Sequence, residues 1–160
     1  MDIEPLSVAN IKAIIESDGG NGWKHDADIW ADRLRKTEAN EQATVVVLID
    51  GRAVGYGSLV WQSGYTPFAE SDTPEIHDLV TAKRCRRSGV ATRIIRQLEG
   101  FAKAVRRSMV GIGVGLYADY GAAQSLYATL GYVPDSRGIT YKGSPVDPGA
   151  EYRVDDHLIL

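Results

Sequence analysis

The sequence predicts a single α/β domain built on a mixed β-sheet, and three observations support this. The length of 160 residues suits one domain that buries a full core. The pair Asp50-Gly51 lies between two strand-like runs and predicts a hairpin, which requires antiparallel neighbours. Connections from strand to helix at residues 81–90 and 117–120 indicate helices layered on that sheet.

The first quarter of the chain predicts a short strand and two helices. Residues 1–6 are expected to form the strand, and Ser7 is placed to cap a helix that carries a periodic apolar face. The glycine-rich run at 18–22 predicts a loop. A second helix is expected from near Asp26 or Asp28 to near Asn40.

The middle of the chain predicts three strands. Residues 44–49 form a continuous β-branched run, which is typical of a strand covered on both faces. Residues 53–61 are the expected return strand of the hairpin, and 62–74 are expected to be a loop. Residues 75–81 predict another strand.

The C-terminal half predicts a long helix, a buried strand and a last helix. The long helix follows Gly89, and its apolar stripe consists of Val90, Ile94, Leu98, Ala102 and Val105. Residues 109–117 suit a buried strand whose three glycines indicate close packing against its backbone. The last helix is expected over 120–130, ending at Gly131, with closing strands at 132–133 and 152–160.

Composition and charge narrow the class of protein. The chain is 44% hydrophobic and 24% charged, and its net charge of -3 argues against a general nucleic-acid coat. No apolar run approaches the roughly 20 residues of a membrane span, and the acidic start lacks the pattern of a secretory signal. A single cysteine excludes an internal disulfide and is compatible with a reducing compartment. We expect a cytoplasmic protein that binds neither nucleic acid nor membrane.

The turn between the strand at 75–81 and the long helix predicts an anion site. Amide groups in the first turn of a helix lack intrahelical partners, and the helix dipole adds positive charge there. Arg86 and Arg87 add full charges, while Ser88, Gly89 and Ala91 are small enough for a phosphate to approach the backbone. The alternative is that both arginines are solvated surface charges and Gly89 only makes a turn.

The pattern Arg86-x-x-Gly89-x-Ala91 resembles the acyl-coenzyme A signature of the GNAT N-acetyltransferase superfamily. The strand at 75–81 resembles the fourth strand of that family, and 122–132 resembles its motif A-x-x-L-Y-x-x-L-G-F/Y. The tail at 154–158 is similar to the closing strands of many members. These segments stand in the family's order and cover about the second half of the chain.

The resemblance implies a twisted, mixed sheet of six or seven strands, with helices on both faces and the fourth and fifth strands splayed. Acetyl-CoA is the implied co-substrate, with no metal. Its pantetheine arm would bind along the fourth strand, an N–H near Leu79 would hold the thioester oxyanion, and the helix mouth would take the pyrophosphate. The implied cofactor-binding residues are Leu79, Val80, Thr81, Arg86, Arg87, Ser88, Gly89, Val90, Ala91, Thr92 and Tyr120. Tyr120 stands where many members have asparagine, so its contact is in question, and the glycines of 109–117 fit a strand that leaves room for the cofactor.

The resemblance also implies catalytic residues. Tyr127 matches the tyrosine that protonates the leaving thiolate, and its reference pKa of about 10 suits a donor to a thiol. Glu75 matches a strand glutamate used as base, and we expect its apolar surroundings to raise its pKa. His77 and Asp78 are rivals for this role, as is a chain of water molecules. Strand alternation predicts Glu75 and His77 on one face and Asp78 on the other.

The acceptor pocket is expected from the first helices and the loop after the third strand. The implied contacts are Trp30, Trp61, Tyr65, His77 and Asp78, although tryptophans and tyrosines are more often core or lid residues. We interpret the chain as an enzyme that moves an acetyl group to a primary amine of a small molecule or peptide, by direct attack in a ternary complex.

Two alternatives to this function stay open. The first is a non-catalytic acyl-CoA-binding sensor or regulatory module. The second is an acyltransferase that uses a longer acyl group or a hydroxyl acceptor. Dimers are common among relatives, so a homodimer is also left open.

Overall fold

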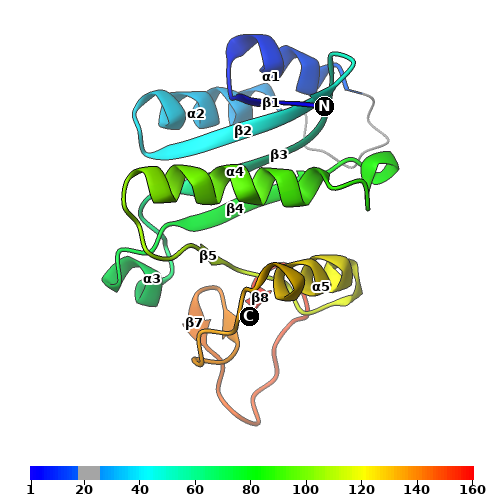
Figure 1. Cartoon of the computed structure of the whole chain (residues 1–160). Helices are drawn as coiled ribbons and strands as arrows, with labels where there is room; N and C mark the ends of the chain where they lie inside the picture. The colour runs from blue at the N-terminus through cyan, green and yellow to red at the C-terminus, as the bar shows by residue number, and fades with distance from the viewer. Residues whose placement is uncertain (18–25) are drawn as a thin grey trace.

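The computed structural model describes residues 1–17 and 26–160, and it shows a five-stranded sheet with helices packed on it (Figure 1). The loop predicted at 18–22 lies outside the described residues. The elements in chain order are β1 (Asp2–Pro5), α1 (Val8–Ile15), α2 (Ala27–Glu38), β2 (Gln42–Ile49), β3 (Arg52–Val60), α3 (Thr66–Glu70), β4 (Glu75–Thr81), η2 (Lys83–Cys85), α4 (Val90–Ala104), β5 (Gly111–Ile112), η3 (Ala118–Tyr120), α5 (Gly121–Leu130), β6 (Thr140–Tyr141), β7 (Ser144–Pro145) and β8 (Leu158–Ile159).

The main sheet has the order β1-β2-β3-β4-β5, and the C-terminal strands form a second sheet, β7-β6-β8. Every pair in the main sheet is antiparallel except β4–β5, which is parallel. The mixed α/β fold class is therefore confirmed. The strand count differs from the expected six or seven in one sheet, because the strands divide into five and three.

The predicted caps and the hairpin are present. Ser7 and Asn10 form a reciprocal capping box at the start of α1, and the Asp26 carboxylate accepts a hydrogen bond from the Asp28 amide at the start of α2. Asp50 and Gly51 have φ values of 51° and 73°, so both central residues of the turn are left-handed, as a tight hairpin requires.

Adjacent residues of β3 show which helices cover each face of the sheet. A Cβ atom at Gly55 would lie 2.6 Å from Val90 of α4, and one at Gly57 would lie 2.7 Å from Ile94 of the same helix. Tyr56, between them, points to the other face, where its ring meets Trp30 of α2 edge-on at 4.8 Å. Helices therefore cover both faces of the sheet.

The apolar stripe of α4 forms the centre of the core. Val90, Ile94, Leu98 and Ala102 are buried, whereas Val105, the last predicted member, follows the helix and is 55% exposed. Each large buried side chain of this stripe contributes about 1.5–3 kcal/mol of burial energy.

Three predictions about local structure are wrong. Residues 62–74 contain a short helix, α3, with Pro67 in its first turn. The strand expected at 109–117 is paired with β4 over only two residues of β5, because the chain beyond Ile112 leaves β4. Residues 132–133 form no strand, and within 152–160 the strand is limited to β8. Among the described residues, no helix is both long and apolar enough to cross a membrane.

Candidate functional site

The N-terminus of α4 carries amide groups that no side chain of the described residues caps. Gly89 is the N-cap residue, with φ of 85°, and lacks a side chain to accept their hydrogen bonds. Open space surrounds the place where its Cβ atom would be. Amides in the first turn of a helix bind anions well, so this end of α4 is suited to a phosphate group.

The turn before α4 is exposed and is stabilised by a hydrogen bond of its own. Arg86, Arg87, Ser88 and Gly89 are exposed, and Arg87 takes a left-handed conformation with φ of 62°. The Ser88 hydroxyl donates to the Cys85 carbonyl oxygen at 2.6 Å and so stabilises the turn itself. Along the first turn of the helix, Val90 is buried, and Ala91 and Thr92 are half-buried.

One edge of β4 is open beside this turn. β4 pairs with β5 only at Glu75–Gly111 and Ile76–Ile112. The chain after β5 turns instead to the C-terminus, where the backbone groups of Val114 and Leu160 exchange two hydrogen bonds of 2.9 and 3.0 Å. The rest of β4, residues 77–81, thus has no described strand on this edge, and its Leu79, Val80 and Thr81 are half-buried.

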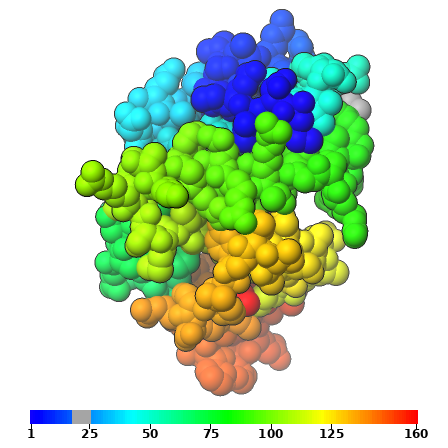
Figure 2. All heavy atoms as spheres, in the orientation of Figure 1, coloured from blue at the N-terminus to red at the C-terminus, as the bar shows by residue number. Residues whose placement is uncertain are grey.

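The surface is hollowed at the same place. Figure 2 shows the green turn after β4 and the yellow start of α5 standing apart, with a gap between them. The splayed fourth and fifth strands that the resemblance implied are therefore present, and an extended ligand arm has both backbone groups and space along β4.

The glycines of 109–117 have a different role from the predicted one. A Cβ atom at Gly111 would overlap the ring of Phe68, and one at Gly115 would overlap the ring of Tyr120. At Gly113, it would lie 2.9 Å from Ile159. These glycines make room for side chains of the protein itself, so they are not support for a bound cofactor.

Glu75 and His77 form a hydrogen-bonded pair on one face of β4. The His77 Nε2 atom lies 2.9 Å from the Glu75 carboxylate, whose side chain is 12% exposed against 46% for His77. The Ser63 hydroxyl donates to the same carboxylate oxygen at 2.5 Å. Ser63 was missed in the sequence because it lies in the expected loop, beside no motif.

The pKa values of this pair move in opposite directions. Burial would raise the pKa of Glu75, but the hydrogen bonds from His77 and Ser63 outweigh it and hold that pKa below its ordinary value. The raised pKa expected for Glu75 is therefore wrong. The hydrogen bond to Glu75 raises the pKa of His77, and this effect exceeds the opposing effect of burial.

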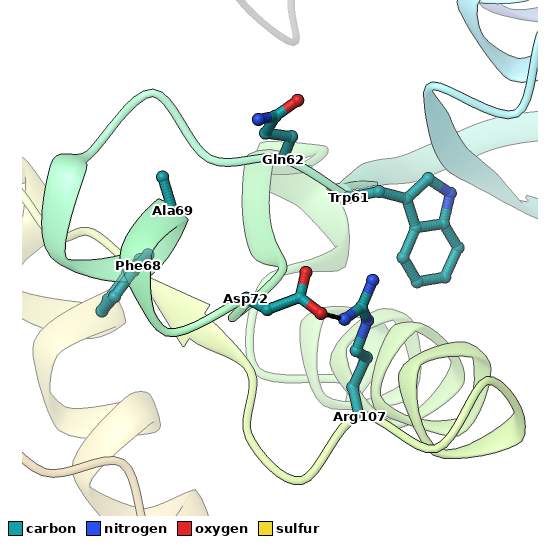
Figure 3. A pocket seen from close by; sticks show the side chains of 6 residues that line it. All are labelled: Trp61, Gln62, Phe68, Ala69, Asp72 and Arg107. Atoms are coloured by element: carbon teal, nitrogen blue, oxygen red, sulfur yellow. Dashed lines mark ion pairs between the residues drawn. The ribbon is translucent and has the colours of Figure 1, made fainter.

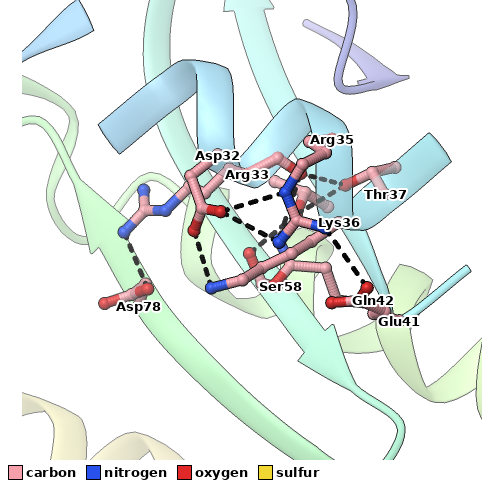
Figure 4. A network of polar contacts seen from close by, with 10 residues as sticks. Asp32, Arg33, Arg35, Lys36, Thr37, Glu41, Gln42, Ser58 and Asp78 are labelled. Atoms are coloured by element: carbon pink, nitrogen blue, oxygen red, sulfur yellow. Dashed lines mark hydrogen bonds and ion pairs between the residues drawn. The ribbon is translucent and has the colours of Figure 1, made fainter. Parts of the chain in front are cut away.

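Asp78 lies on the same face as His77, which the alternation argument did not predict. Tyr56 pairs with Val80 and Ser58 with His77, so Asp78 and Leu79 together oppose Gly57 in a β-bulge. The bulge turns Asp78 toward α2, where its carboxylate accepts a hydrogen bond of 2.7 Å from Arg33 (Figure 4). This leaves Asp78 engaged by a cation, and it makes Arg33 a neighbour of the site that sequence reasoning missed.

Tyr127 projects from α5 and is 9% exposed. Burial raises its pKa to about 12, and the nearby Tyr120 adds to the shift. A phenol with this pKa keeps its proton near neutrality and so presents an O–H donor. The position predicted for an acid therefore holds a buried, protonated phenol.

Tyr120 is held by the C-terminal segment. Its hydroxyl donates to Asp156 at 3.0 Å, and Tyr117 donates to the same carboxylate oxygen. The rings of these two tyrosines meet edge-on with centroids 5.0 Å apart. The charge of Tyr120 affects the pKa of Tyr127, so the two are neighbours, but the hydroxyl of Tyr120 is engaged within the protein.

The three aromatic residues predicted for the acceptor pocket lie in different places. Trp30 is fully buried in the core, so it offers no surface to an acceptor and that prediction is wrong. The Tyr65 hydroxyl donates to Asp135 at 2.8 Å, and its amide donates to Ser63, the partner of Glu75. Tyr65 thus lies beside the Glu75–His77 pair and joins the loop after β3 to the loop after α5.

Trp61 lines a separate pocket of about 300 Å³ at the end of β3. Figure 3 shows its indole across from an ion pair between Asp72 and Arg107, with Phe68 and Ala69 beyond. Val60, the last residue of β3, pairs with Glu75, so this pocket lies at the same end of β4 as the Glu75–His77 pair. The contact of Trp61 with an acceptor stays a prediction.

Comparison with known proteins agrees with this geometry. Residues 11–132 match the model of the family described as "Acetyltransferase (GNAT) family". No curated protein sequence matches the chain at a significant level.

Solved structures share the fold at low sequence identity. An aminoglycoside 6'-N-acetyltransferase from Acinetobacter haemolyticus is 22% identical, with a TM-score of 0.65 over 92% of this chain and 100% of that one. AAC(6')-Iy, solved with a bisubstrate analogue, is 18% identical, with a TM-score of 0.70 over 88% of this chain and 95% of that one. Glucosamine-6-phosphate N-acetyltransferase from Arabidopsis thaliana is 16% identical, with a TM-score of 0.63 over 84% and 92% respectively.

Proposed function

The chain belongs to the GNAT family of acetyltransferases, and on this basis we propose that it transfers the acetyl group of acetyl-CoA to a primary amine by direct attack in a ternary complex. The observation that carries the proposal is the continuous path from the uncapped amides of α4, along the open edge of β4, to the Glu75–His77 pair. Each part of that path suits one part of the thioester and its acceptor.

The coenzyme is held by backbone groups in this proposal. The amides from Arg87 to Thr92 bind the pyrophosphate, with Arg86 and Arg87 adding positive charge. The backbone of Leu79 to Thr81 bonds the pantetheine arm as an added strand. A backbone amide of the bulge, near Leu79, donates a hydrogen bond to the thioester oxygen as that oxygen gains negative charge.

Protons move at two places. The attacking amine loses a proton to neutral His77, which is the more exposed member of its pair, while Glu75 stabilises the imidazolium that forms. When the carbon–sulfur bond breaks, the thiolate takes the phenolic proton of Tyr127, which solvent later replaces. The family role of Glu75 as base is thus shared with His77, and Asp78 takes no part because Arg33 binds it.

The acceptor is a small molecule or a peptide that carries a primary amine. The names of two structural neighbours, both aminoglycoside acetyltransferases, make aminoglycosides the first acceptors to test. The third neighbour is named for glucosamine 6-phosphate, so the shared fold alone does not choose between amines.

The test is a panel of amines incubated with acetyl-CoA and followed by release of free thiol. We expect one acceptor at least to gain the mass of one acetyl group in step with thiol release. Tight binding of acetyl-CoA without turnover on any amine would contradict the proposal and favour a coenzyme-binding module.

A further inference from the structure

We propose that Arg33 is a positioning residue for acetyl transfer. Its ion pair with Asp78 fixes the bulge of β4, and the bulge orients the backbone amide that donates a hydrogen bond to the thioester oxygen. The inference rests on the proposed function, since that amide matters only if a thioester binds beside it. It assigns a role to α2, which meets β4 through this ion pair.

The bulge places its residues in a conformation that needs support. Asp78 and Leu79 lie opposite the single residue Gly57, so one backbone amide is left out of the β3–β4 ladder. Asp78 has φ of 52°, a left-handed value that residues other than glycine rarely adopt. Such a conformation persists where surrounding contacts hold it, and relaxes where they do not.

Packing and hydrogen bonds hold Arg33 in the position that provides this support. Its guanidinium carbon lies 4.7 Å from the ring centroid of Trp30 and 5.2 Å from that of Tyr56, and its side chain is 15% exposed. Its own carbonyl oxygen accepts hydrogen bonds from Thr37 at 2.8 Å and Gln42 at 3.5 Å. Both the backbone and the head group of Arg33 are therefore held before it meets Asp78.

The ion pair of Arg33 differs from the others on the same helix. Arg33 reaches across to Asp78 of β4 at 2.7 Å. In contrast, Asp32 pairs within α2, with Arg35 at 3.0 Å and Lys36 at 2.6 Å, and Arg35 also reaches Glu41 just past the helix (Figure 4). Removing Arg35 is thus a matched control that deletes an arginine of α2 without touching β4.

The position of the bulge explains why its geometry bears on the reaction. Asp78 and Leu79 directly follow His77, the proposed proton acceptor, and Leu79 begins the stretch that takes the pantetheine arm. A donor must stand within hydrogen-bonding distance of the oxygen that becomes charged. A bulge free to relax would move that amide relative to both reactants.

The first experiment measures conformational exchange of the bulge in the protein without ligand. Amide nitrogen relaxation dispersion over residues 77–80 is compared in wild type, Arg33→Met and Arg35→Met. We expect flat profiles in wild type and Arg35→Met, and exchange at Asp78 and Leu79 in Arg33→Met. Flat profiles in folded Arg33→Met would overturn the proposal. Asp78→Asn, which keeps a residue tolerant of this φ and all of the Arg33 packing, replaces Arg33→Met if that variant fails to fold.

The second experiment measures the rate of acetyl transfer and the polarisation of the thioester carbonyl. In Arg33→Met we expect kcat to fall about 10- to 100-fold while KM for acetyl-CoA stays within about twofold, because the pyrophosphate site is intact. The infrared carbonyl stretch of bound ¹³C-labelled acetyl-CoA should lie below that of the free thioester in wild type and return toward it in Arg33→Met. An unchanged kcat or an unchanged carbonyl frequency in the folded variant would overturn the proposal.

The two experiments separate this inference from the proposed function. Wild-type protein that transfers no acetyl group would refute the proposed function. The dispersion data would still decide whether Arg33 holds the bulge, because they need neither coenzyme nor acceptor.

Discussion

His77 and Glu75 share a hydrogen bond of 2.9 Å on one face of β4, with the histidine toward solvent and the carboxylate inward. The bond raises the pKa of His77 and contributes to lowering that of Glu75. A proton accepted by His77 is therefore stabilised by a charge that is already in place.

The pH dependence of the rate tests this pair. In wild type, the rate should rise as His77 loses its proton, with a midpoint above its ordinary pKa of 6.5. Glu75→Gln removes the main cause of the raised pKa, so the rising limb should move to lower pH and the plateau should fall. With one fixed acceptor, the titration of the amine enters the kcat/KM profiles of wild type and variant equally, so it cancels in their ratio. If the rising limb of Glu75→Gln has the same midpoint as that of wild type, His77 is not the group that accepts the proton.

The same pair has a signature in stability. The contribution of His77 is complete below about pH 6.5, its ordinary value, and is lost as pH rises through the higher pKa of the folded state. That of Glu75 is complete above about pH 4.5 and is lost as pH falls through its lowered pKa. Both are therefore present near pH 5.5.

Replacement of His77 by glutamine should consequently destabilise the protein more at about pH 5.5 than at about pH 9. The difference in unfolding free energy at the lower pH should be under about 1 kcal/mol, because solvent screens a side chain that is 46% exposed. Urea unfolding at the two pH values measures it. His157→Gln, which removes a histidine of the C-terminal segment, is the control. An equal effect of His77→Gln at both pH values would argue against the ion pair.

Tyr127→Phe should lower kcat about 100-fold and leave the affinity for coenzyme A unchanged, since general acids contribute on this scale and the ring is retained. The matched control is Tyr132→Phe. It removes a phenol whose ring centroid lies 6.1 Å from that of Tyr127, but whose hydroxyl donates to Glu99. Steady-state rates and calorimetric titration measure the two effects. Equal losses in both variants would remove Tyr127 from the acid role.

Gly89→Glu should abolish coenzyme binding. The substitution places a negative side chain at the helix mouth and strains a backbone with φ of 85°. Gly149→Glu adds the same charge at the same φ of 85° in open space on the C-terminal segment, so it controls for strain and net charge. Retained affinity of Gly89→Glu for acetyl-CoA in a calorimetric titration would count against the site.

The parts of this fold that were predictable depend on local signals. The left-handed residues at Asp50-Gly51 and Gly89 follow from the conformational freedom of turn residues, and the bounds of β4 follow from an uninterrupted strand-like run. The short helix α3 also had such a signal, since Pro67 suits a first turn.

The parts that were missed depend on distant partners. The bulge at Asp78 arises only when β4 pairs with Gly57, and that register displaces the alternation expected along the strand. Ser63 and Arg33 come to β4 from a loop and from a charged helix, so no spacing along the chain links them to it. The glycines of 109–117 correctly indicated close packing, but the packing side chains, Phe68, Tyr120 and Ile159, come from elsewhere in the chain.

The most direct test follows the backbone amides themselves as acetyl-CoA is added to ¹⁵N-labelled protein. We expect saturable, large shifts of the Val90, Ala91 and Thr92 amides, together with shifts of Leu79 and Thr81. A spectrum that does not change, or shifts confined to other parts of the chain, would mean that the thioester does not bind along β4 and the mouth of α4.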